Sequence, residues 1–297
     1  MAVDIQNYAK LLEPGLRKVF FDAYTEKPEQ YSKVFQTKPS KKLTETDYHI
    51  GDLGIWDQFN GSVNYEDLGG TQTVTFTNIE FAKGFSVKMS SAEDDLYGIL
   101  DGEGGKRART LAKGAKRRVE TQAATILNGG FTNTGYDGVS LFSNSHPLLG
   151  NAGGTTDNLT TGALTDANLK AGLLVMRKQV DETGMMIEAM ANRLIVPADL
   201  EYTAITLTQS AQTAGTANND VNAIRGKLSV VVYDYLTSST AWYLQDSSFE
   251  NLIFFWRVRP QFFAENDNDH FLLKYTGRMR CVAGYSDHRG LVGSLGT

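Results

Sequence analysis

The chain has 297 residues, of which 41% are hydrophobic and 21% charged, a composition that excludes a disordered protein and is enough for one large or two modest cores. With 34 acidic and 29 basic side chains its formal net charge is -5, which argues against a regulator that finds DNA through overall charge. Its single cysteine, Cys281, excludes an internal disulfide and most cysteine-based metal sites, and we expect it to be a small buried residue of a strand.

The N-terminal region divides into a helix and an extended segment. Residues 4–24 predict an amphipathic helix whose apolar side chains share one face: Leu12, Leu16, Val19 and Phe20. Pro14 is expected to restart this helix rather than to lie in its middle. Residues 25–45 are rich in Lys, Pro, Thr and Ser, which is typical of a strap without a core of its own.

Two strand-like runs follow, Gly54 to Phe59 and Gln72 to Val87, with turn residues near 67–70 between them. They predict a long hairpin of about forty residues. An isolated two-stranded ribbon is marginally stable in water, so the hairpin must rest on something. Either a partner subunit covers it, or it folds back on its own domain as an ordinary sheet edge.

Residues 103–127 predict a long helix of about 37 Å with one small apolar stripe and one basic face. The segment from 106 to 118 contains seven basic side chains and no acidic one: Lys106, Arg107, Arg109, Lys113, Lys116, Arg117 and Arg118. Two interpretations stay open, a solvated face or a surface that attracts phosphates without reading bases. No aromatic residue is interleaved with these charges, so stacking on single strands is not expected.

The second half of the chain mixes short helices with strands. A Gly/Ser/Asn/Thr-rich loop to residue 161 is followed by a helix from N-cap Thr165 to Gly184, a strand at 193–196, a helix at 198–209 and a loop to about 220. Strands are predicted at 228–233, 241–245, 252–258 and 271–285. Because the order does not alternate strand and helix, the predicted fold class is α+β.

No constellation typical of catalysis or of metal binding is present. The Gly-rich segment 101–107 departs from a phosphate-binding loop, and residues 267–269 lack the glycine and distal Glu of a calcium loop. Four histidines are scattered without zinc-site spacing: His49, His146, His270 and His288. Ser143 and Ser145 lack a nucleophile elbow. We therefore expect no catalytic residue, no cofactor, no metal ligand and no enzymatic activity.

The order of these parts resembles the major capsid proteins of tailed bacteriophages, which have the Hong Kong 97-like fold. The resemblance covers nearly the whole chain and is carried by the strap, the hairpin, the long helix, the Arg193-Leu194-Ile195-Val196-Pro197 module and two late strands. Residues 141–184, beginning Leu141-Phe142-Ser143-Asn144-Ser145-His146-Pro147-Leu148, and residues 192–200 look similar to the Mu-like head subunit group.

The resemblance implies five parts. They are an N-terminal arm (1–46), an E-loop hairpin (47–91), a peripheral domain (92–160) with a spine helix (103–127), an axial domain (161–250), and return strands of the peripheral domain (251–297). Loops of the axial domain, including 212–220, would line the centres of the capsomers.

The implied function is self-assembly, as hexamers and pentamers, into an icosahedral shell that encloses the double-stranded DNA genome of a tailed phage. The expected location is the virion capsid, assembled in the host bacterial cytoplasm, with scaffold, portal and decoration proteins as partners and no membrane. The seven basic residues of the long helix are the candidates for the inner, DNA-proximal face. The candidates for contacts between subunits are Leu12, Phe20, Phe35, Trp56, Phe59 and Tyr65.

Two departures from the family pattern give further expectations. The presumed E-loop tip, residues 60–73, contains no Lys, so we expect no covalent cross-link of the kind that some relatives form there. The arm begins almost at Met1, so a scaffold is expected to be a separate protein. Two alternatives remain, an encapsulin-like cargo shell of the same fold and a β-rich phage tail or adhesion module.

Overall fold

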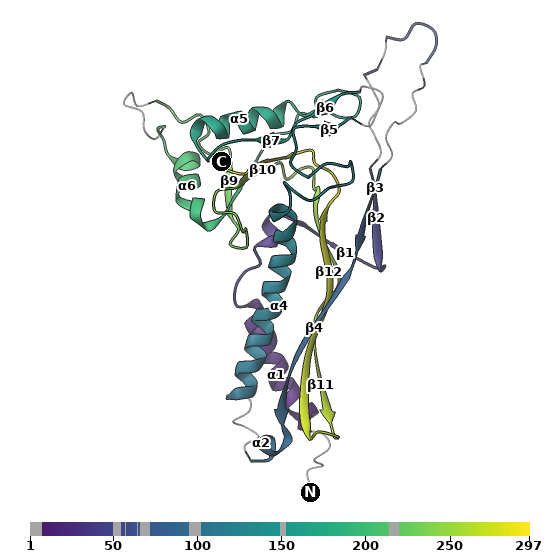
Figure 1. Ribbon diagram of the computed structural model, residues 1–297, viewed down its shortest axis with the longest axis vertical. Coiled ribbons are helices and arrows are strands. Elements are labelled where there is room, and N and C mark those ends of the chain that lie inside the picture. The colour runs from purple at the N-terminus through teal and green to yellow at the C-terminus, as the bar shows by residue number, and fades with distance from the viewer. Residues whose placement is uncertain are drawn as a thin grey trace.

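The computed structural model describes residues 8–49, 55–56, 58–63, 65, 72–94, 102–148, 153–213 and 220–297. Figure 1 shows a long stem, built from a sheet and two helices, and a smaller module of helices and short strands at the end of the stem opposite the N-terminus. The mixture of helices and antiparallel strands confirms the predicted α+β class.

The stem is built on a four-stranded sheet in the order β1-β11-β12-β4. Its centre is the antiparallel pair β11 (Leu252–Asp267) and β12 (Leu272–Tyr285), flanked by β4 (Ile79–Lys88) and by β1 (Gln36–Pro39), which runs parallel to β11. The strand predicted at 252–258 continues to Asp267, with a register irregularity between Val258 and Gln261, where Pro260 lies. Cys281 is buried in β12, as predicted.

Helices α1 (Tyr8–Thr25) and α4 (Glu103–Asn128) lie side by side on the stem. The prediction that Pro14 restarts α1 is wrong, because the helix continues through it. Pro14 is on the exposed side, where the carbonyl that loses its helical partner can bond to water, while Leu12 and Leu16 are buried on the opposite side. A short helix, α2 (Met89–Asp94), follows β4.

The module at the end of the stem has a five-stranded sheet in the order β7-β13-β10-β8-β9. Its strands are β7 (Leu159–Thr160), β8 (Arg193–Val196), β9 (Ser229–Val232), β10 (Trp242–Gln245) and β13 (Leu291–Ser294). It is accompanied by α5 (Asp166–Arg177), η3 (Ala198–Leu200) and α6 (Glu201–Gln209), while β5 (His146–Pro147) pairs with β6 (Thr155–Thr156) nearby. Strand β13 was not predicted.

Helix α5 begins at the predicted N-cap, where the Thr165 side chain accepts a hydrogen bond from the Asn168 amide. The helix was predicted to continue to Gly184, but it ends at Arg177. The Asp181 carboxylate accepts hydrogen bonds from the Thr183 and Met185 amides, and this local turn replaces the next helical turn.

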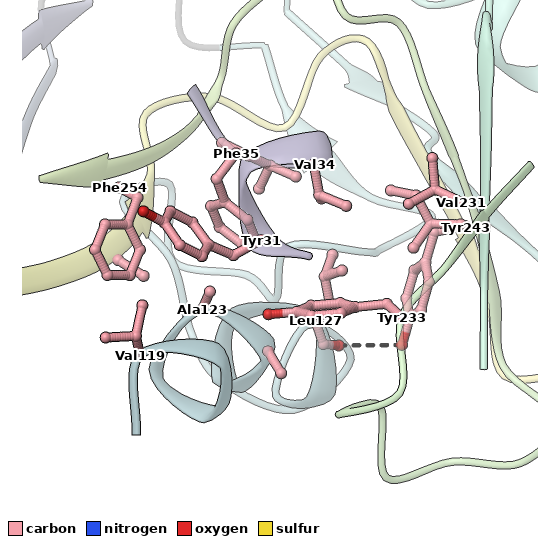
Figure 2. Packing of buried hydrophobic residues seen from close by; sticks show 14 of the residues in the cluster. Tyr31, Val34, Phe35, Val119, Ala123, Leu127, Val231, Tyr233, Tyr243 and Phe254 are labelled. Atoms are coloured by element: carbon pink, nitrogen blue, oxygen red, sulfur yellow. Dashed lines mark hydrogen bonds between the residues drawn. The ribbon is translucent and has the colours of Figure 1, made fainter. Parts of the chain in front are cut away.

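The stem and the module share one apolar core, which contains residues from the arm, the long helix and both sheets. Figure 2 shows part of it, with η2 (Tyr31–Lys33) packed over α4 and the Tyr243 hydroxyl donating to the Leu127 carbonyl, 3.2 Å away. The Tyr233 hydroxyl similarly donates to the Glu120 carbonyl at 2.8 Å. The C-terminal end of α4 is therefore fixed to both parts of the molecule.

A two-stranded ribbon leaves the side of the stem (Figure 1). It pairs β2 (Thr44–His49) with β3 (Gln72–Thr77) in antiparallel register. This corrects the predicted hairpin: the described residues of the run from Gly54 to Phe59 form no strand, and the run from Gln72 to Val87 splits at Asn78 into β3 and β4. Among the described residues no helix has the length and apolarity required to cross a bilayer.

Candidate functional site

The basic face of α4 forms one wall of a groove of about 740 Å³, and β4 and β12 form the opposite wall. Four of the seven predicted basic residues line this groove: Lys106, Arg107, Arg117 and Arg118. Two more basic side chains come from the strands, Lys83 in β4 and Arg278 in β12. The floor is apolar, with Phe81, Phe85, Leu111 and Met279 among its residues. The groove is thus lined by six basic side chains and by one acidic residue, Glu80.

Sequence reasoning missed Lys83 and Arg278 because they are almost two hundred residues apart in the chain. Antiparallel pairing of β4 with β12 places Lys83 opposite Gly277 and Ala82 opposite Arg278. No local pattern carries that information, since it depends on long-range strand register. Arg278 forms an ion pair with Glu80 at 2.6 Å, which reduces the net charge of this end of the groove.

Two groove residues are held in place by their own chain. The Arg107 guanidinium donates a hydrogen bond of 2.7 Å to the Ser86 carbonyl, and the Arg118 guanidinium stacks over the Phe81 ring at 4.3 Å from its centroid. Cation–π stacking leaves the edge of a guanidinium available for hydrogen bonds to an anion. The groove therefore presents pre-positioned cationic groups.

The remaining predicted basic residues do not line the groove. Lys116 donates to the Tyr24 carbonyl at 3.2 Å and to the Lys27 carbonyl, and its ammonium lies over the Tyr24 ring. Lys113 is 3.7 Å from the Glu26 carboxylate, and Arg109 is exposed on the helix outside the groove lining. Lys116 thus helps to fix the end of α1 to α4, while Lys113 forms a half-exposed ion pair beside it.

The described part of the ribbon between β2 and β3 exposes a dense group of large apolar side chains. Trp56 is 93% exposed, Tyr65 90% and Phe59 71%, and Ile55 and Val63 are also exposed. The base of the ribbon is anchored through Phe76, which is buried with its ring centroid 5.3 Å from that of Phe255. A patch of this size is typical of a surface that another molecule covers.

The other three candidates for subunit contacts are buried by the chain itself. Leu12, Phe20 and Phe35 are at most 3% exposed, packed among α1, α4 and the four-stranded sheet. This corrects the expectation that a neighbouring subunit covers them, because the arm lies in the core of its own subunit.

Within the predicted axial loop, Gln212 pairs with Val221, and residues 214–219 lie outside the described residues.

Two of the histidines that look unrelated in the sequence lie together. His146 and His288 stack with parallel rings, and Asp137 faces both of them in a buried cluster. Burial opposes ionisation of Asp137, but the hydrogen bond with His146 holds the pKa of Asp137 below its usual value. Burial also lowers the pKa of His288 to about 4. No spacing rule finds this cluster, because Asp137 and His146 follow α4 in the chain, whereas His288 lies in the turn between β12 and β13.

Solved structures establish the fold. A chain of the procapsid of bacteriophage JBD30 has a TM-score of 0.52 and 19% identity, over 96% of this chain and 74% of that one. A chain of the JBD30 capsid has a TM-score of 0.58 and 18% identity, and the match covers 73% of this chain and 94% of that one. A chain of a virus-like particle from Pyrococcus furiosus has a TM-score of 0.52 and 10% identity, and the match covers 95% of this chain and 98% of that one. The chain has the Hong Kong 97-like fold of viral shell subunits, as the resemblance implied.

The family follows from the sequence match. Residues 81–294, well over half of the chain, match the family model described as phage capsid protein. The chain belongs to the phage capsid protein family, a family of virion structural proteins. This match removes the support for a tail or adhesion module.

A curated relative agrees with this assignment. The major capsid protein of Escherichia phage Mu is 23% identical over 164 residues, which are 55% of this chain and 52% of that protein. The matched region therefore spans about half the length of this relative.

Proposed function

We propose that the chain is the major capsid protein of a tailed bacteriophage and that its copies assemble, as hexamers and pentamers, into the icosahedral shell around the double-stranded DNA genome. The observation that carries this proposal is the exposed apolar patch of the ribbon. A fully buried large apolar side chain contributes about 1.5 to 3 kcal/mol, so the patch represents a strong drive towards association. Covering Trp56, Phe59 and Tyr65 with a neighbouring subunit satisfies it.

A matched pair of tyrosine substitutions tests the role of the ribbon. Tyr65→Ser removes an exposed ring from the ribbon, and Tyr202→Ser removes a ring that is 79% exposed on α6. We expect sedimentation analysis to find closed particles for Tyr202→Ser and small oligomers for Tyr65→Ser. Equal assembly of the two variants would show that the ribbon is not the contact on which the shell depends.

The basic groove supports contact with packaged DNA. Four of its six cationic side chains are spaced along α4, and the attraction of such side chains to phosphates is independent of base sequence and sensitive to salt. We place this face on the inner wall, where it reduces repulsion between packaged phosphates. Scaffold and portal proteins are the further partners expected of such a shell, and the module containing α5 and α6 is the proposed axial domain.

Charge reversal tests the inner-face assignment. Lys106→Glu with Arg117→Glu changes the groove, whereas Arg225→Glu with Lys227→Glu makes the same change of charge on exposed residues outside it. Filled heads of the groove variant should release DNA at lower temperature, and most clearly at low salt, than wild-type or control heads. Identical release from all three would place the groove away from DNA.

A second candidate is an encapsulin-like shell that holds protein instead of a genome. The similarity over 95% of this chain to the virus-like particle from Pyrococcus furiosus favours considering it. Particles purified from the native source distinguish the two, because a genome shell contains DNA and a cargo shell contains a second protein.

A further inference from the structure

The sequence contains two Asn-Gly pairs, Asn60-Gly61 and Asn128-Gly129, which the structure holds in opposite ways. In such a pair the main-chain nitrogen of the glycine can attack the side-chain amide of the asparagine, because glycine has no Cβ to obstruct the approach. The attack requires that both groups are free to move towards each other. Hydrogen bonds that hold the amide or the nitrogen therefore protect the pair, and exposure without such bonds leaves it reactive.

The pair at the end of α4 is held firmly. Asn128 is the last residue of this helix, and its Nδ2 group donates to the Tyr235 carbonyl at 3.1 Å, while its Oδ1 atom accepts from the Thr237 amide at 2.9 Å. The Gly129 amide donates to the Thr125 carbonyl at 2.9 Å, so the nitrogen that would attack is also engaged. We expect this pair to stay intact.

The pair in the ribbon lacks these restraints. Asn60, Gly61 and Ser62 are exposed and form a bend outside any helix or strand. Gly61 has a φ of 99°, in the left-handed region that favours glycine, and no atom lies within 4 Å of the position that a Cβ would occupy there. No described residue forms a hydrogen bond with the Asn60 side chain or with the Gly61 amide. Both reacting groups are thus free and open to water.

We propose that Asn60 deamidates spontaneously while the chain is unassembled. The Gly61 nitrogen loses its proton and forms a bond to Asn60 Cγ. The bond between Cγ and Nδ2 breaks, and Nδ2 leaves with a proton as ammonia, so that a cyclic succinimide remains. Water then adds to one of the two succinimide carbonyl carbons and opens the ring, which gives aspartate or isoaspartate. Either product carries a carboxylate where the neutral amide was.

The new carboxylate would lie in the surface that a neighbouring subunit covers, so its effect on assembly rests on the proposed function. Asn60 directly follows Phe59, which is 71% exposed in that surface. Between Leu43 and Thr73 the sequence contains six acidic residues and no Lys or Arg, so this segment offers no Lys or Arg to pair with a further carboxylate. Burying a carboxylate is costly unless a cation accompanies it. Deamidated subunits should therefore enter the shell less readily than intact ones.

The chemistry is tested on the full wild-type chain, kept too dilute to assemble at neutral pH and sampled over time. Peptide mass spectrometry detects the loss of one ammonia and the gain of one water, and fragmentation assigns the change to a residue. We expect Asn60 to convert several times faster than Asn128. Asn60→Gln is a matched variant that keeps the amide on a longer side chain, which disfavours ring closure, so its residue 60 should stay intact. Equal conversion of the two asparagines, or none at Asn60, would overturn the proposal.

A second measurement follows the product into the shell. Partly deamidated wild-type chain is concentrated until it assembles, and sedimented particles are compared with the unassembled fraction. We expect intact Asn60 in the particles and its product enriched in the unassembled fraction, and equal contents would overturn the effect on assembly. Asn60→Asp should likewise form fewer particles than Asn144→Asp, which adds the same charge at an exposed residue outside the ribbon. If fresh wild-type chain formed no particles, the shell proposal would fail, whereas the conversion of Asn60 in the free chain would stand.

Discussion

Two segments of the subunit differ in how much of their apolar surface the subunit itself buries. The N-terminal arm (residues 8–39) lies along the stem and is largely buried. The ribbon (β2, β3 and the described residues between them) leaves the stem, and its outer side chains are exposed. In the arm, Phe20 lies 5.4 Å from Phe262, and the Tyr31 ring lies 4.5 Å from Phe254. In the ribbon, Trp56 and Tyr65 are almost fully exposed. The arm therefore contributes to subunit stability, and the ribbon is free to contribute to association.

The arm is fixed by polar contacts as well as by packing. The Glu120 carboxylate of α4 accepts hydrogen bonds from the Gln30 amide at 2.7 Å and from the Tyr31 amide at 2.9 Å. The Trp256 indole donates to the Tyr31 hydroxyl at 3.0 Å. These groups have no counterparts among the described residues of the outer ribbon. The difference predicts that substitutions in the arm change folding, while substitutions in the ribbon change assembly.

The largest expected effect is that of Phe20→Ala. Removing a fully buried ring leaves a cavity between α1 and the sheet and should lower the free energy of unfolding by about 3 to 5 kcal/mol in urea denaturation. The neighbouring Phe21→Ala, at a ring that is 38% exposed, is the control and should cost about 1 kcal/mol or less. Similar losses for both would mean that the arm is not part of the subunit core in solution.

The next effect is that of Glu120→Ala, which leaves two backbone donors without acceptors and should cost about 2 to 3 kcal/mol at pH 7. Burial raises the pKa of Glu120, although the amide hydrogen bonds oppose the shift. The folded state thus binds the proton more tightly than the unfolded state. Proton binding by Glu120 therefore stabilises the folded state. This stabilisation is complete at pH values below the ordinary pKa of 4.5, and it decreases as the pH rises through the raised pKa of the folded state.

The stability difference between wild type and Glu120→Ala should consequently be larger at pH 5 than at pH 7. Urea denaturation of both proteins at the two pH values measures this difference. A difference that shrinks at the lower pH would contradict the assigned direction of the pKa shift.

A smaller effect is expected for Lys116→Met, which removes the ammonium that bonds to two carbonyls at the end of α1. The loss should be about 1 to 2 kcal/mol. Lys113→Met is a matched control, because its ion pair with Glu26 is half-exposed on both sides and should contribute less than about 0.5 kcal/mol. If the two variants had the same melting temperature, Lys116 would contribute no more to subunit stability than Lys113 does. The whole basic face would then be a surface for solvent or for a ligand.

The smallest effect on the subunit is expected for Trp56→Ser and Tyr65→Ser. Since these rings make few contacts in the subunit, unfolding free energies should change by less than about 0.5 kcal/mol. The measurement is urea denaturation of the unassembled chain, compared with sedimentation of the same variants. A loss of more than about 2 kcal/mol would mean that the ribbon folds against its own subunit.

Local patterns predicted the elements whose sequence alone determines them. The long helix, the Thr165 cap, the strand at 193–196 and strand β12 follow from periodicity or capping chemistry. Pro14 shows the limit of such patterns, because burial of Leu12 and Leu16 outweighs one missing hydrogen bond. The end of α5 was missed because the Asp181 turn competes with a helix of similar propensity.

Features that depend on long-range contacts could not be predicted. Residues 25–45 looked like a strap without a core, because Phe254 and Trp256, the partners of Tyr31, lie more than two hundred residues later in the chain. The groove needs the register of β4 with β12, and the Asp137–His146–His288 cluster needs the segment after α4 to meet the turn between β12 and β13. In each case the residue types were visible and their proximity was not.

The most direct test of the account is the accessibility of Trp56 before and after assembly. Trp242 and Trp256 are at most 4% exposed, so Trp56 is the tryptophan that a soluble quencher reaches in the unassembled chain. Acrylamide should quench one component of the fluorescence of free subunits strongly, and that component should become protected in sedimented particles. Particles in which Trp56 remains fully quenchable would contradict the claim that copies of the chain cover the ribbon.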